Sequence, residues 1–220
     1  MISDHDQQRF LGLTLRLLTK ADAIRSDADT ADRLGTKKIA SVHQMHGKNV
    51  AIVSQPTSRV IKADGLITQT PGLTLTIRAA DCQNLLVYVP KQKVIGLLHA
   101  GWRGLVCGAI PSFFHTLKEH FDVAGKDALV YAGPSLCMRC SDFTDPAREL
   151  PNIDPKFFSG KYVDLRGIAD DQLRYCGVIM ENVTRHSDCT RCKPDLYWTY
   201  RGGDREKVME GWTNVLCASM

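Results

Sequence analysis

Short runs in which apolar and polar residues alternate dominate the first part of the chain. Leucines at every second position over residues 11–17 alternate with small or polar residues, as in a strand with one buried face. Further runs rich in Val, Ile, Leu and Thr predict strands, and the turn residues between these runs keep the strands short. These strands are expected over residues 38–43, 49–54, 73–78, 84–89, 94–99 and 128–132. The fourth and fifth of them are close enough in sequence to form a hairpin.

Helical periodicity is confined to three segments. Residues 21–35 predict a short polar helix that stops at Gly35. A second helix is expected to begin near Gly104, because apolar residues then recur at helical spacing as far as Phe121. Pro111 lies inside this segment, so the helix is expected to be kinked there or to start later.

The third helix is expected to run from an Asp164 cap to a Gly177 stop, and residues 178–183 follow as a strand. Strands therefore come in runs, with few helices between them. This order predicts an α+β fold, a single domain with mixed β-sheets flanked by helices. We find no strong domain boundary, so one domain is expected over residues 1–220.

The composition narrows the class of protein. The 220 residues are 44% hydrophobic and 24% charged, which excludes a disordered or fibrous chain. No apolar run reaches the roughly 18 residues of a membrane span, and residues 1–8 lack the blocks of a secretory signal. We therefore expect a cytoplasmic protein without a membrane partner. The net charge of +4 is scattered, so no nucleic-acid partner is expected.

Eight cysteines stand out in this composition. In a reducing compartment they are expected to be metal ligands, nucleophiles or packing residues rather than disulfides. Cys82, His46 and His99 each lie at the end of a predicted strand or beside a glycine, where a rigid scaffold places functional groups. One thiolate and two imidazoles suit a zinc site whose fourth position is open to water. Spacing alone favours the alternative, two packed histidines and a small buried cysteine, because nothing in the linear sequence brings the three together.

The segment HAGWRG, residues 99–104, places polar chemistry between glycines that let the backbone approach a ligand. Within it, Arg103 can bind a phosphate or a carboxylate, and it lies near the expected start of a helix, itself an anion site. A glycine-rich turn with a solvated arginine is the alternative interpretation.

Several short segments occur here in the order that they have in YfiH-like proteins. They are QMHG (44–47), ADGLIT (63–68), ADC (80–82), HAGWRG (99–104) and GPS (133–135), with Cys189-Thr190 and Tyr200-Arg201 near the end. Over roughly residues 37–205 the chain therefore resembles the YfiH-like family. Its members have been described as laccase-like multicopper polyphenol oxidoreductases, as purine nucleoside phosphorylases and as a peptidoglycan editing factor.

The resemblance implies a YfiH-like α+β fold with one metal-bearing pocket. It implies that His46, Cys82 and His99 are catalytic metal ligands and that the metal is zinc. It also implies a purine nucleoside and phosphate as substrates. The expected activity is a zinc-dependent purine nucleoside phosphorylase, acting on adenosine, inosine, guanosine or methylthioadenosine, with adenosine deaminase activity as well.

Two further roles follow from the resemblance as hypotheses. Phosphorolysis needs an anion site, for which Arg103 is the natural candidate. Deamination by a zinc enzyme needs a nearby carboxylate for proton transfer, and Asp64 and Asp81 are the acids in the motifs. A turn or capping role is the alternative for both.

Other function classes remain open. A laccase-like copper polyphenol oxidoreductase would need many histidines in close pairs, whereas the chain has seven and no His-X-His. A Cys-dependent hydrolase acting on peptidoglycan fragments would use Cys82 as the nucleophile and a histidine as the base. A binding protein with a degraded pocket is also open.

Two C-X-X-C pairs suggest a second metal site. Cys137 and Cys140 form one pair, where the family often has adjacent cysteines, and Cys189 and Cys192 form the other. Four such thiolates suit a structural zinc. However, the 48 residues between the pairs exceed the usual zinc-ribbon spacing. Separate thiols on two loops, or a labile redox pair, are the alternative.

Overall fold

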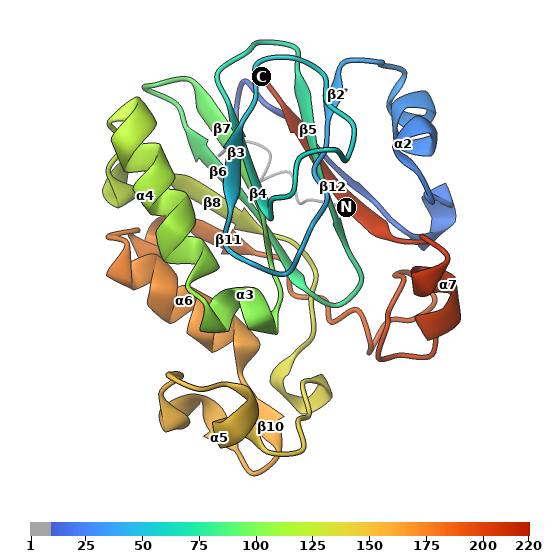
Figure 1. The fold of residues 1–220 in the computed structure, drawn as a ribbon, viewed down its shortest axis with the longest axis vertical. Helices are drawn as coiled ribbons and strands as arrows, with labels where there is room; N and C mark the ends of the chain where they lie inside the picture. The colour runs from blue at the N-terminus through green and yellow to red at the C-terminus, as the bar shows by residue number, and fades with distance from the viewer. Residues whose placement is uncertain (1–9) are drawn as a thin grey trace.

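The computed structural model describes residues 10–220 and arranges them in layers (Figure 1). Two β-sheets pack face to face in the middle of the molecule. Helices α3, α4 and α6 cover the outer face of the larger sheet, and α2 lies against the outer face of the smaller one. The predicted α+β class with mixed sheets flanked by helices is confirmed.

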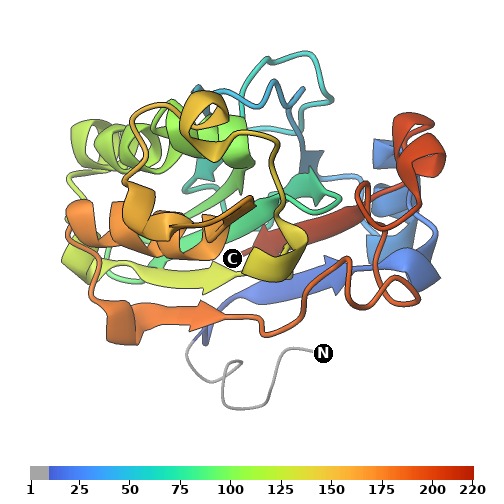
Figure 2. The same cartoon turned by 90° about the horizontal axis from the view of Figure 1, so that it is seen from below.

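Strands from distant parts of the chain make up both sheets. The larger sheet has the order β11 (Val183–Arg185), β8 (Leu129–Ala132), β6 (Gln83–Val89), β7 (Val94–Ala100), β4 (Gly65–Thr68) and β3 (Val50–Ile52). The smaller sheet has the order β1 (Thr14–Leu18), β12 (Asn214–Ser219), β5 (Thr74–Ala79) and β2 (Ile39–Ala40). Strands β9 (Phe158–Ser159) and β10 (Tyr162–Val163) pair antiparallel to form a separate two-stranded ribbon. Figure 2 shows β11 beside β8 and β12 beside β1.

The helices are short. They are α2 (Asp27–Leu34), α3 (Trp102–Val106), α4 (Ala109–Phe121), α5 (Pro146–Glu149), α6 (Leu165–Tyr175) and α7 (Arg205–Met209). The predicted end of α2 at Gly35 and the predicted Asp164 cap of α6 are confirmed, since Gly35 adopts a left-handed conformation and the Asp164 side chain accepts from the Gly167 N–H. None of the helices in residues 10–220 is long and apolar enough to cross a membrane.

The core explains why β6 and β7 read as continuous apolar runs. Leu86 and Leu97 face the smaller sheet, whereas Leu85 and Leu98 face the helices, where they pack with Phe113. Both faces of the strands are therefore buried, so their sequences show little alternation. Packing on both faces consequently holds these two strands in place.

The predicted hairpin of β6 and β7 is confirmed, and it determines which residues are neighbours. Its register places Asn84 opposite His99. On the other side of β7, strand β4 pairs antiparallel, with Gly65 opposite Leu98. The His99 N–H donates to the carbonyl oxygen of Asp64 at 2.8 Å. Sheet pairing thus brings Asp64, which precedes β4, beside His99.

Some boundaries differ from those that the sequence predicts. The expected second helix is divided at Gly108, whose φ of 78° is left-handed, and Pro111 lies in the first turn of α4, where no N–H has a helical partner. The expected strand over residues 178–183 is wrong: strand β11 begins only at Val183, where it meets β8 in parallel. Strands β4 and β12 are not predicted from the sequence. Both are buried almost throughout and, unlike β6 and β7, neither forms a hairpin with a strand next to it in the chain.

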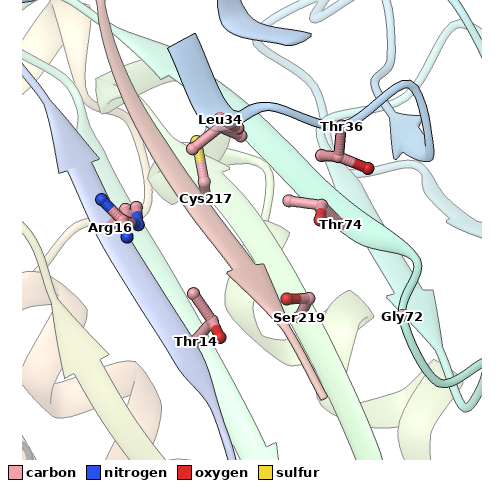
Figure 3. Close-up of a pocket in the computed structure, with 8 residues that line it drawn as sticks. All are labelled: Thr14, Arg16, Leu34, Thr36, Gly72, Thr74, Cys217 and Ser219. Atoms are coloured by element: carbon pink, nitrogen blue, oxygen red, sulfur yellow. The ribbon is translucent and has the colours of Figure 1, made fainter. Parts of the chain in front are cut away.

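A hollow of about 270 Å³ opens on the outer face of the smaller sheet (Figure 3). It is lined by Thr14, Arg16, Leu34, Thr36, Gly72, Thr74, Cys217 and Ser219. None of the predicted site residues lines it. Burial raises the pKa of the Cys217 thiol to about 12, so this cysteine is a packing residue rather than a nucleophile.

Candidate active site and metal centre

The three residues of the first predicted metal site come together from three parts of the chain. His46 lies in the loop after β2, Cys82 lies between β5 and β6, and His99 lies near the end of β7. Their ligand atoms all lie within 4.8 Å of one another. The two imidazole rings meet edge to face with centroids 4.8 Å apart. The set of one sulfur and two nitrogens fits a zinc ion that keeps a position for water or substrate.

The cluster is buried on one side and open on the other. His99 is only 3% exposed, whereas Cys82 is half-buried and His46 is exposed. His46 also adopts a left-handed backbone conformation, with φ of 59°. A ligand would therefore approach from the His46 side, while the sheet holds His99 in place.

Asp64 contacts both the His46 loop and the His99 side chain. Its buried carboxylate accepts hydrogen bonds from the backbone N–H groups of Met45, His46 and Gly47 and contacts His99 Nδ1 at 2.9 Å. When Nδ1 donates to a carboxylate, Nε2 of the same ring is left as the metal-binding nitrogen. Asp64 thus both shapes the His46 loop and orients His99.

The hydrogen bonds keep Asp64 ionised. Burial opposes the charged form, but hydrogen bonds from His99 and from the Gly47 N–H outweigh it and lower the pKa of the Asp64 carboxyl. A fixed negative charge therefore lies behind His99.

Cys82 and His99 perturb each other. Burial opposes ionisation of Cys82, but the charge of His99 and hydrogen bonds from His46 and His99 lower the pKa of the thiol to about 6. Burial also opposes the charge on His99, yet Cys82 and Asp64 raise the pKa of the imidazole to about 9. Without a metal the pair is therefore a thiolate and an imidazolium at neutral pH. A metal would take the place of the imidazolium proton.

Glycine is required where the HAGWRG segment passes the cluster. A Cβ atom on Gly101 would lie 2.8 Å from Cys82 Sγ and 3.3 Å from His46 Cδ2. A Cβ on Gly104 would lie 3.2 Å from the carbonyl oxygen of Gly47. The two glycines therefore let the backbone pass close to the cluster and to the His46 loop. Their predicted role, close approach to a bound ligand, stays a prediction.

Arg103 lies between these two glycines, in the first turn of α3. Its side chain is exposed, and its guanidinium stacks on the Trp102 ring at 4.4 Å from the centroid. The stacking orients the guanidinium without using its N–H groups, which stay available for an anion.

Asp81, the other candidate acid, binds residues of the C-terminal segments rather than the residues of the first cluster. It has a left-handed backbone, with φ of 89°, and a buried carboxylate. Thr190 and Thr199 donate to its Oδ1 atom, and the Arg201 N–H donates to Oδ2. Sequence reasoning missed this network, although Thr190 and Arg201 lie in the C-terminal segments that resemble the family. Asp81 ties those segments to the residue before Cys82.

The four cysteines of the second predicted site also converge. The Sγ atoms of Cys137, Cys140, Cys189 and Cys192 all lie within 4.8 Å of one another. The cluster lies on loops rather than on the sheet, since one pair follows β8 and the other follows β11. It is chemically different from the first cluster, with four sulfurs and no imidazole.

Comparison with known proteins agrees with this architecture. Residues 19–212 match the model of the family described as multi-copper polyphenol oxidoreductase laccase. The chain is similar to a purine nucleoside phosphorylase of Bacteroides thetaiotaomicron, at 39% identity over 63% of this chain and 55% of that protein. A purine nucleoside phosphorylase of Aquifex aeolicus is 28% identical over 80% of this chain and 82% of its own length.

The fold resembles the crystal structure of YlmD from Geobacillus stearothermophilus, with a TM-score of 0.83 and 21% identity over 97% of this chain and 94% of that one. At this identity the likeness concerns the fold alone, and it confirms the predicted YfiH-like architecture together with a Bacillus licheniformis YfiH structure of TM-score 0.76. The chain spans between 34% and 55% of the length of three of the curated relatives that it matches.

Proposed function

The chain belongs to the multi-copper polyphenol oxidoreductase laccase family, and from that premise we propose that it is a zinc-dependent purine nucleoside phosphorylase that also deaminates adenosine. The observation that carries the proposal is the convergence of His46, Cys82 and His99 within 4.8 Å on one open face. The relatives named purine nucleoside phosphorylase support the reaction class. The substrates are then a purine nucleoside and phosphate.

The three ligands divide the work of holding the metal. His99 is fixed by the sheet and by Asp64, Cys82 supplies a thiolate, and His46 completes the set from the exposed side. A zinc ion bound there would supply Lewis-acid chemistry to a substrate or water oxygen. Copper is the alternative ion for the same donor set.

Arg103 is proposed to bind phosphate. It is exposed, stacked on Trp102, and placed between two glycines that touch the cluster and its loop. A guanidinium in this position can bind two phosphate oxygens at once and hold the nucleophile beside the sugar. Its loss should raise the KM for phosphate more than the KM for the nucleoside.

Asp64 is proposed to serve both activities. The hydrogen bonds of its carboxylate are all with the site: three backbone N–H groups and His99. For phosphorolysis it acts as a positioning residue that orients His99. For deamination a carboxylate must also move a proton, and Asp64 is our candidate. Asp64→Asn should therefore depress deamination more than phosphorolysis.

Product analysis tests the proposal. Protein of known metal content is incubated with adenosine or inosine, with and without phosphate, and free base, ribose 1-phosphate and ammonia are measured. We expect base and ribose 1-phosphate only with phosphate, and ammonia from adenosine. No turnover by folded, zinc-loaded protein would contradict the function.

Cys82→Ala tests the site separately. The activity of this variant should fall to background, and the variant should bind one metal ion per chain fewer than wild type. Cys107→Ser is the matched control, because Cys107 is exposed and lies outside both clusters. Unchanged turnover by Cys82→Ala would refute the site assignment even if the activity itself is found.

A second candidate function is a cysteine hydrolase acting on peptidoglycan fragments. The contacts of Cys82, His99 and Asp64 have the order of a nucleophile, a base and an orienting acid. In that case His46 would be dispensable and activity would survive a chelator. Loss of activity on chelation, recovered by zinc, favours the phosphorylase.

The copper oxidase has less support in the described residues. Two histidines and a cysteine are the ligand types of a blue-copper centre. Within residues 10–220, however, the groups that could hold a metal contain no further histidine. Metal analysis of the purified protein and oxygen uptake with a phenol distinguish this function from phosphorolysis.

A further inference from the structure

The four cysteines of the second cluster have nearly the spacing that a metal requires. Cys137 immediately precedes the 3-10 turn Met138–Cys140 after β8, and Cys140 is the last residue of that turn. Cys189 and Cys192 lie in the loop after β11. The Sγ atoms of Cys140 and Cys192 are 3.5 Å apart, and those of Cys137 and Cys192 are 4.0 Å apart. Sulfurs bound tetrahedrally to zinc at ~2.3 Å would be about 3.8 Å apart. Only small shifts would therefore close the site.

Packing does not explain why the four thiols gather. Cys189 is buried, but Cys137 and Cys140 are only half-buried and Cys192 is exposed. Cysteines that serve as small hydrophobic residues belong in a core, whereas this cluster lies between two surface loops. All four thiols are free in the part of the chain that the structure describes. Their shared feature is a set of sulfur atoms directed at one point.

The surroundings suit negative charge on the sulfurs. The Cys137 N–H donates to Cys189 Sγ at 3.2 Å, a bond that favours a thiolate. Zinc with four thiolates has two net negative charges, which nearby cations must offset. Arg166 interacts electrostatically with Cys137 and Cys189 and donates to the carbonyl oxygens of Ser135 and Asp188. It thus bridges both loops beside the cluster.

Both loops of the cluster also contact Asp81. The Leu136 N–H, next to Cys137, donates to the carbonyl oxygen of Asp81 at 3.2 Å. Thr190, next to Cys189, donates from its hydroxyl to the Asp81 carboxylate at 2.7 Å. Asp81 immediately precedes Cys82. Two short chains of contacts therefore connect the four-cysteine cluster to the thiol of the first site.

We propose that Cys137, Cys140, Cys189 and Cys192 bind a structural zinc ion, which clips the loop after β11 onto the loop after β8 and so holds Asp81 in place behind Cys82. The four-sulfur site stands independently of the enzymatic function, whereas its effect on metal binding at Cys82 rests on the proposed function. A closed set of four cysteines leaves no position for substrate, as in structural zinc sites.

A zinc ion at this position would stabilise a part of the fold that has little regular secondary structure. The segments around the two pairs consist mainly of turns and loops, and the pairs are separated by 48 residues. A bond between the pairs removes much of the freedom of this long segment in the unfolded chain. Metal binding would thereby contribute directly to folding.

Metal content and X-ray absorption test the site without altering it. The Cys82→Ala variant lacks a ligand of the first site, so its remaining zinc reports on the four-cysteine cluster. We expect one zinc per chain, with four sulfurs at about 2.3 Å in the absorption spectrum. Wild type should hold two. Cys82→Ala without zinc, or with zinc bound to nitrogen or oxygen, would overturn the proposal.

Substitution provides the second arm. Cys137→Ser and Cys192→Ser should each lose one zinc per chain relative to wild type, and the Cys107→Ser control should lose none. Wild type with one zinc, together with unchanged metal content in Cys137→Ser, would refute the site. If a serine variant fails to fold, the Cys82→Ala absorption measurement still decides. Zinc-free protein with two cluster disulfides, detected by thiol counting, would also refute it.

Hydrogen exchange tests the coupling. Zinc is removed from Cys82→Ala by a chelator, and amide exchange is compared with that of the loaded protein. We expect faster exchange over residues 133–143 and 186–204 and also at residues 80–82, with no change in α2. A change confined to the two loops would contradict the link to Cys82 while leaving the zinc site standing. This outcome is distinct from failure of the enzymatic function, because no turnover is measured.

Discussion

The two candidate metal clusters are built on different parts of the molecule and have different chemistry. His46, Cys82 and His99 surround one end of the larger sheet, where the sheet and Asp64 hold the most buried ligand. The four cysteines lie between two loops outside the sheet. The first set has three ligands and an exposed side; the second has four sulfurs and no free position.

This difference separates two tasks of a protein-bound metal. A catalytic ion needs an open position, and its ligands must be held rigidly by their surroundings. A structural ion needs a complete ligand set, and it can itself impose order on loops. In this chain the contacts of Asp81 join the two regions, so order at the second cluster would reach Cys82.

The largest expected effect comes from filling the space beside the first cluster. In Gly101→Ala, the new Cβ would lie 2.8 Å from Cys82 Sγ and must push the ligands apart. We expect loss of the first metal and of phosphorolysis, with zinc at the four cysteines retained. Metal analysis and turnover measure both. Loss of both ions would show that zinc binding at the four cysteines depends on the first cluster, contrary to this prediction.

Asp64→Asn should weaken the first site without removing a ligand. Loss of the charge behind His99 is expected to reduce metal affinity about 10–100-fold, as for other residues that orient metal-bound histidines. Competition with a chromophoric chelator measures the affinity. Asp127→Asn, at an exposed position outside both clusters, is the control. Equal affinity in Asp64→Asn and wild type would refute the positioning role.

The pH dependence of Cys82 alkylation tests the ion pair of the first cluster in metal-free protein. The pKa of Cys82 is lowered to about 6, so its reactive thiolate should persist as the pH falls from 9 and disappear only near 6. Mass spectrometry of the Cys82 peptide after timed alkylation gives the midpoint. His99→Ala removes the main favourable charge and should move the midpoint upward. A Cys82 midpoint near 9 in wild type would contradict the ion pair.

The smallest effect is expected where the two regions meet. Thr190→Val removes one of three donors to the Asp81 carboxylate, which Thr199 and the Arg201 N–H still bind. A hydrogen bond to a charged group contributes about 1.5–3 kcal/mol to stability, and we expect a loss of this size in the free energy of unfolding. Urea denaturation measures it, with Thr144→Val at an exposed position as the control. A wild-type value for Thr190→Val would mean that this contact does not stabilise the loop.

The local elements of the fold were largely accessible from the sequence. The β6–β7 hairpin, the break near Pro111 and the Asp164 cap depend on residues close together in the chain. Strand β12 was missed because its partners β1 and β5 are distant in sequence, and burial on both faces removes the alternation that marks a strand. The expected strand over residues 178–183 began too early, since only pairing with β8 decides where β11 starts.

By itself the sequence determined which side chains are able to bind a metal: two histidines and a cysteine beside glycines, and two C-X-X-C pairs. These are properties of residue type and short spacing. Only the tertiary structure decided that each set meets at one point, that Asp64 orients His99, and that Asp81 connects the cysteine loops to Cys82. The physical reason is that these contacts depend on sheet register and loop packing, which bring together residues that the linear pattern leaves far apart.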